Sequence, residues 1–154
     1  MYDSRDDTLK HIKQVSKFLW QVVCVIIKRS TIHDSSKLLE PEKSMFDKYT
    51  PLLRDSTYGS PEYKKTLENM GVALRHHYQS NSHHPEHYPN GVNGMSLIDV
   101  IEMLADWKAA SLRHGDGDIL KSIEINKERF GISDQLHEVI KNTIVEMGWA
   151  VKED

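Results

Sequence analysis

Residues 75–110 read RHHYQSNSHHPEHYPNGVNGMSLIDVIEMLADWKAA, and the rest of the chain is best interpreted outward from this stretch. Five of the nine histidines of the chain fall between His76 and His87, and three acidic residues follow them: Asp99, Glu102 and Asp106. Imidazole and carboxylate ligands together suit Mn, Fe, Zn and similar divalent metals. The stretch therefore predicts a metal centre, to which His33-Asp34 upstream would contribute.

Apolar residues recur at helical spacing on both sides of this stretch, and no polar-apolar alternation typical of strands appears. A long helix is predicted from a cap at Asp3 or Ser4 to about Lys28. Five more are predicted: residues 41–54, residues 60–77, a helix after Ser96, a helix that begins at Gly117 or Asp118, and a helix after Ser133. The sequence thus predicts an all-α protein, a single domain over residues 1–154 with about six helices.

Composition narrows the function classes. An apolar fraction of 38% and a charged fraction of 28% are typical of a soluble globular protein. The net charge of -3 argues against stable nucleic-acid binding, which needs a basic face. The acidic N-terminus does not resemble a signal peptide, and the apolar run of residues 18–27 is about half a membrane span. A cytoplasmic protein without membrane association is expected, in the host cytoplasm if it is phage-encoded.

Helical periodicity also predicts which way the histidines and acids point. Residues 63, 67, 70 and 74 form an apolar stripe that His77 continues, so His77 is expected to face inward and His76 outward. Asp99, Glu102 and Asp106 form one acidic stripe at spacings i, i+3 and i+7. A solvated face is the alternative, but closely flanking apolar residues disfavour it: Ile98, Ala105 and Trp107.

Other candidate residues have two open interpretations. His11 shares a helix face with Val15 and Val22, so it is either a core histidine with satisfied hydrogen bonds or a metal ligand. Lys37 follows Asp34 by three residues, and it either lies near the metal or is solvated or paired with Asp34. His114 and His137 are expected at the surface.

The order of these residues is H…HD…H…HH…D, from His11 to Asp106, and it resembles the HD-domain superfamily of metal-dependent phosphohydrolases. The segment HDSSK at residues 33–37 is similar to the HD-x-G-K motif of the HD-GYP branch. Residues 83–109 are similar in outline to its double-His segment, Tyr-Pro loop and following helix. The chain also resembles small uncharacterised HD-like proteins of phages and bacteria, which share an HD-x-S-K segment and a DWKAA helix.

The resemblance implies an all-helical fold that binds one or two divalent ions, namely Mn, Fe, Zn, Co or Mg. It implies His33, Asp34 and Asp106 as the main ligands, with others completing one or two sites: His11, His77, His83 and His84. Three cations would contact phosphate: Lys37, Arg75 and Lys108. Asp99 or Glu102 would handle the proton or orient a ligand histidine.

The reaction implied is hydrolysis of a nucleotide or related small phosphoester by metal-activated water. A cyclic dinucleotide is disfavoured, because the D-G-x-G that precedes Tyr-Pro in the HD-GYP branch is missing here. Two alternatives remain open: a non-catalytic HD-like module that binds a nucleotide or a partner protein, and an HD-type di-iron oxygenase. Several amphipathic helices would also allow a homo-oligomer.

Overall fold

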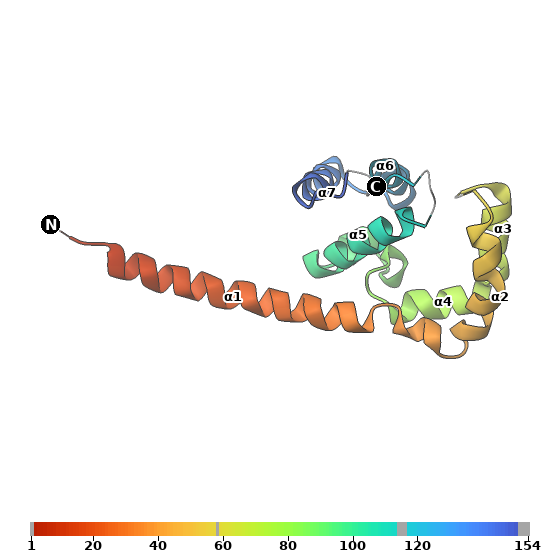
Figure 1. Cartoon of the computed structure of the whole chain (residues 1–154), viewed down its shortest axis with the longest axis horizontal. Helices are drawn as coiled ribbons and strands as arrows, with labels where there is room; N and C mark the ends of the chain where they lie inside the picture. The colour runs from red at the N-terminus through yellow and green to blue at the C-terminus, as the bar shows by residue number, and fades with distance from the viewer. Residues whose placement is uncertain (1, 58, 114–116, 151–154) are drawn as a thin grey trace. The chain divides into compact units, whose positions relative to one another are not determined.

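The computed structural model describes residues 2–57, 59–113 and 117–150 (Figure 1). These three ranges contain seven α-helices and three short 3₁₀ helices, and they contain no β-strand. The prediction of an all-α fold is therefore confirmed, and the number of helices is close to the six expected.

The chain divides into two compact units, Met1–His33 and Asp34–Asp154, so its organisation as a single domain stays a prediction. Helix α1 makes up most of the first unit and runs over Arg5–Ile32, four residues past the expected end at Lys28. Ser4 stands at its N-cap position without a side-chain cap hydrogen bond, and none of its residues is buried. No helix in the described part of the chain is both long and apolar enough to cross a membrane.

The second unit contains the other six α-helices. They are α2 (Glu42–Arg54), α3 (Pro61–Asn69), α4 (Gly71–Ser80), α5 (Leu97–Ser111), α6 (Ile119–Phe130) and α7 (Asp134–Glu146). The 3₁₀ helices are η1 (Ser35–Leu38), η2 (Pro85–His87) and η3 (Gly91–Gly94). The prediction of one helix over residues 60–77 is wrong in one respect, since the helix is interrupted at Met70. Gly71, which has a low helix propensity, follows at the break.

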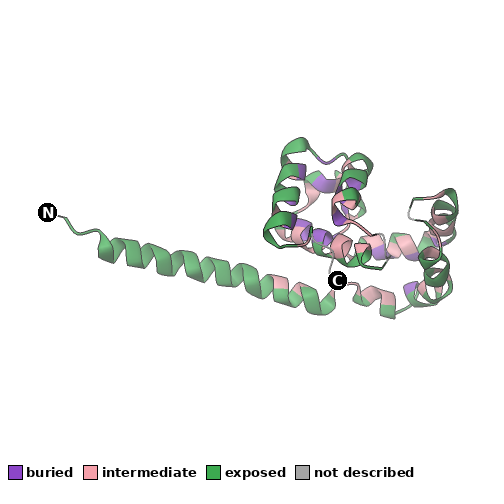
Figure 2. Ribbon diagram, turned by 45° about the horizontal axis from the view of Figure 1, so that its top comes forward, coloured by how far each residue is buried: buried purple, intermediate pink, exposed green. Residues whose placement is uncertain are grey.

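The hydrophobic core of the second unit is built mainly by α5, α6 and α7 (Figure 2). Ile123, Ile140 and Ile144 are each at most 2% exposed. The predicted caps position these helices: Ser96 accepts the amide of Asp99, Asp118 accepts the amide of Leu120, and Ser133 accepts the amide of Leu136. Each cap satisfies a backbone donor that the first helical turn cannot pair.

The expectation that His137 lies at the surface is wrong. His137 is only 4% exposed, and its Nε2 lies 3.2 Å from Oε1 of Glu124. The physical reason is periodicity, because His137 precedes Ile140 by three residues and Ile144 by seven and so shares the buried face of α7. His114 lies outside the described residues.

Two isoleucines of α6 test this core. Ile123 is 1% exposed, and Ile123→Ala should lower the free energy of unfolding by about 2–4 kcal/mol because it leaves a cavity. Ile125 is 51% exposed on the same helix, and Ile125→Ala should stay within about 0.5 kcal/mol of the parent. Urea unfolding followed by circular dichroism measures both, and equal losses would contradict the assignment of the core.

Candidate metal centre

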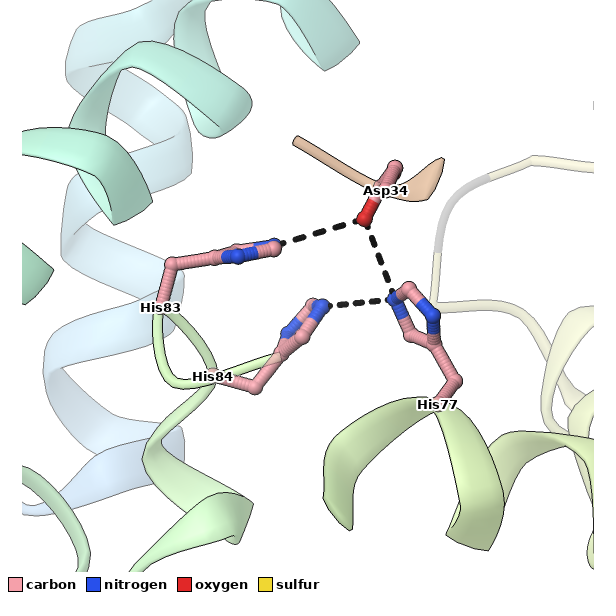
Figure 3. Close-up of side chains that lie close together, drawn as sticks. All are labelled: Asp34, His77, His83 and His84. Atoms are coloured by element: carbon pink, nitrogen blue, oxygen red, sulfur yellow. Dashed lines mark hydrogen bonds and ion pairs between the residues drawn. The ribbon is translucent and has the colours of Figure 1, made fainter. Parts of the chain in front are cut away.

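Four side chains of the second unit meet at one point: Asp34, His77, His83 and His84 (Figure 3). Oδ1 of Asp34 lies 3.3 Å from Nε2 of His77 and 3.5 Å from Nε2 of His83. Nε2 of His77 lies 2.8 Å from Nε2 of His84. One ligand atom from each of the four residues lies within 4.8 Å of the others. We refer to these residues as the four-residue cluster.

Asp34 enters this cluster from an unusual backbone position. It is the N-cap residue of η1 and has φ 54° and ψ 13°, in the left-handed region. Among non-glycine residues, Asp and Asn adopt this region most readily, yet such a conformation still costs about 1–3 kcal/mol. Strain of this kind is common where a functional side chain must be aimed in a particular direction.

A buried glutamate orients His77. Glu42, the first residue of α2, is fully buried, and its Oε2 lies 2.9 Å from Nδ1 of His77. The carboxylate can only accept, so Nδ1 carries the proton and the lone pair of Nε2 faces Asp34. Glu42 also accepts hydrogen bonds from Nδ1 of His76, at 2.7 Å, and from Oγ of Ser36, at 3.0 Å.

The carboxylate of Glu102 contacts Nδ1 of His83, as the carboxylate of Glu42 contacts Nδ1 of His77. Oε1 of Glu102 lies 3.2 Å from Nδ1 of His83, whose side chain is 1% exposed. Ligand histidines in metal sites usually donate their second ring nitrogen to a carboxylate or carbonyl, which fixes the tautomer and the ring orientation. Two of the three histidines in the cluster have this arrangement, so their Nε2 atoms are held toward a common point.

Burial keeps two of these imidazoles, those of His77 and His84, neutral. The pKa of His84 is lowered to about 3, chiefly by burial and then by the nearby His83 and His77, although Asp106 and Asp34 oppose the shift. Burial also lowers the pKa of His77, as does the positive charge of Lys37. Metal binding requires deprotonated imidazole nitrogens, and these two rings supply them at neutral pH.

The acidic stripe of α5 faces this region instead of solvent. Carboxylate oxygens of Asp106 and Asp34 lie within 4.8 Å of each other. Asp99 is 3% exposed and accepts four hydrogen bonds, from Oγ of Ser82 at 2.8 Å, the hydroxyl of Tyr88 at 2.9 Å, and the amide and hydroxyl of Ser96 at 2.8 and 2.6 Å. Ser82 precedes His83 in the segment of residues 81–84 between α4 and η2, which we call the histidine loop. Asp99 therefore anchors the histidine loop to the start of α5.

Of the three predicted phosphate contacts, the structure brings Lys37 to the cluster. Nζ of Lys37 lies 2.5 Å from Oδ2 of Asp34, which matches the interpretation that it pairs with Asp34. Lys108 donates to the carbonyl of Trp149 at 3.1 Å, beyond the end of α7. Arg75 is exposed on α4, and its side chain runs back toward Gly71. His77 follows Arg75 by two positions, which places the two side chains on roughly opposite sides of the helix.

Two predicted ligands belong to the first unit. His33 ends that unit, donates its amide to the carbonyl of Arg29 and precedes Asp34 by one peptide bond. His11 lies on α1 and is exposed. Their assignment as ligands stays a prediction.

Residues 1–147 match DUF5662, a family of unknown function. The chain belongs to DUF5662. No curated protein and no solved structure matches the chain. The function of this DUF5662 member is therefore inferred from the geometry of the site.

Glu42 has no role in the sequence-based interpretation of this DUF5662 chain. An acid in the first turn of a helix is ordinary, because it favours the helix dipole. Only the tertiary contacts with His76 and His77, more than 30 positions along the chain, show that Glu42 belongs to the site.

The orientation of His77 by Glu42 is testable. Glu42→Gln should weaken binding of Co²⁺ or Zn²⁺ by about 10–100-fold, since the amide is a poorer acceptor for Nδ1. Glu124→Gln is the matched control, because it removes a carboxylate beside a buried histidine, His137, outside the cluster. Isothermal titration calorimetry measures both affinities, and an equal effect of the two substitutions would contradict the orienting role.

Proposed function

We propose that this DUF5662 protein is a metal-dependent phosphohydrolase. The convergence of Oδ1 of Asp34 with Nε2 of His77, His83 and His84 is the observation that carries the proposal. A donor set of three imidazoles and one carboxylate favours Mn, Fe, Co or Zn. Mg, the remaining metal of the predicted set, prefers oxygen ligands and is less suited to this cluster.

Asp34 is the residue that would allow two ions instead of one. Its carboxylate has an oxygen within 4.8 Å of a ring nitrogen of each of the three histidines and an oxygen within 4.8 Å of a carboxylate oxygen of Asp106. A shared carboxylate between neighbouring ions is compatible with this arrangement. His33, the chain neighbour of Asp34, is proposed to complete the coordination, as the resemblance to the HD-domain superfamily implies. His11 is not proposed for this site, because it lies roughly 30 Å from the end of the continuous helix α1 at about 1.5 Å per residue.

A bound divalent ion would supply water of lowered pKa and polarise a phosphoryl oxygen. Lys37, whose Nζ pairs with Oδ2 of Asp34, would neutralise a phosphate oxygen of the substrate. Glu102, with its side chain 16% exposed and in contact with His83, is the better candidate for handling a proton. The four hydrogen bonds accepted by Asp99 suit it to positioning the histidine loop instead.

The substrate class follows from the proposed kinship with HD-domain phosphohydrolases and is a nucleoside mono- or triphosphate. A direct test incubates the purified chain with Mn²⁺ and a nucleotide panel and measures released phosphate and nucleoside. Turnover that chelation abolishes is the expected result. Tight metal binding with no product from any nucleotide would overturn hydrolysis and favour a binding module, and oxygen consumption by iron-loaded protein would favour an oxygenase.

Loss of a carboxylate ligand should abolish this turnover. Asp34→Ala and Asp106→Ala are each expected to lower turnover by more than about 100-fold and to reduce bound metal, because a direct ligand matters more than an orienting group. Both variants should keep the helical circular dichroism of the parent. Asp47→Ala is the control, since Asp47 is an exposed carboxylate that pairs with Lys43. Undiminished hydrolysis by both variants would refute the ligand assignment.

A further inference from the structure

Phe46, on α2, contacts a cation and an imidazole of the site. Nζ of Lys37 lies over its ring, 4.9 Å from the ring centroid. The ring of His77 lies in a T-shaped arrangement with it, with 5.6 Å between the centroids and an interplanar angle of 68°. A cation within about 6 Å of a ring centroid is attracted to the negative face of the ring, so Phe46 stabilises the ammonium of Lys37 at this position.

Helical spacing explains why α2 contacts the site twice. Phe46 follows Glu42 by four positions, so both side chains lie on the same face of α2. Glu42 accepts a hydrogen bond from Nδ1 of His77, and Phe46 lies against the ring of the same histidine. One face of α2 therefore supplies both a hydrogen-bond acceptor and an aromatic surface to the site.

The ammonium of Lys37 contacts both the ring of Phe46 and the carboxylate of Asp34, whose Oδ2 lies 2.5 Å from Nζ. Its charge also reaches His77, whose pKa it lowers. An ammonium has three donors, so Lys37 can pair with Asp34 and still donate to a phosphate oxygen. Because the four-carbon stem of lysine is flexible, a second contact restricts the positions of the ammonium, and Phe46 supplies that contact.

We propose that Phe46 is a positioning residue, which holds the ammonium of Lys37 beside Asp34 where it can meet a phosphate oxygen of the substrate. The inference rests on the proposed function, because that function gives Lys37 its phosphate contact. Phe46 acts through Lys37 and contacts neither the phosphate nor the metal. Removal of its ring should therefore lower the affinity for phosphate more than the affinity for metal, since Glu42 continues to hold His77.

Calorimetric titration of inorganic phosphate into the Co²⁺-loaded full chain tests this role without requiring turnover. Phe46→Leu removes the ring face and keeps an apolar side chain, so the phosphate affinity should fall by about 3–10-fold. The Co²⁺ affinity and the helical circular dichroism should stay close to those of the parent. Phe46→Tyr should bind phosphate as the parent does, because it keeps the ring.

Tyr49→Leu is the matched control on the same helix. Nζ of Lys48 lies 4.9 Å from the centroid of Tyr49, the same distance as between Lys37 and Phe46, but Lys48 is not a residue of the site. Removal of this ring should leave the phosphate affinity unchanged. Equal losses in the two leucine variants, or no loss in Phe46→Leu, would overturn the proposal. A Co²⁺-loaded parent that binds no phosphate would overturn it as well.

A double-mutant cycle tests whether Phe46 acts through Lys37. Lys37→Gln should weaken phosphate binding, and addition of Phe46→Leu to Lys37→Gln should cause no further loss. A loss of the same size in both backgrounds would show that Phe46 affects phosphate binding by another route, and it would overturn the proposal. Because phosphate binding is measured without turnover, absence of hydrolysis in the nucleotide assay is distinguishable from failure of Phe46 to position Lys37.

Discussion

The approach of a partly buried carboxylate to three imidazoles is the constraint around which the second unit is arranged. Removing these polar groups from water is costly unless each one finds a partner. Glu42 and Glu102 satisfy the outer nitrogens of His77 and His83, and Lys37 pairs with one oxygen of Asp34. The inner atoms, Oδ1 of Asp34 and one nitrogen of each histidine, lie within 4.8 Å of one another, and a divalent cation is the ligand that we propose for them.

Helix α5 connects this polar site to the hydrophobic core. One side of α5 contributes Val100, Met103 and Leu104 to the core with α6 and α7. Its acidic side carries Asp99, which holds the histidine loop, and Glu102, which contacts His83. The packing that stabilises the fold therefore also fixes the positions of the carboxylates, so the site is supported by a rigid element.

The sequence by itself determined the all-α fold, most of the helices and their ends, and the inward direction of His77, because periodicity and capping depend on residues within a few positions of one another. Its acidic stripe was predicted to face inward for the same reason. Only the tertiary structure decided that Glu42 orients His77, that Asp99 fastens the loop through Ser82, and that Lys108 bonds to Trp149. These pairs lie 17 to 41 positions apart, and such distant contacts follow from how the helices pack, which local periodicity does not specify.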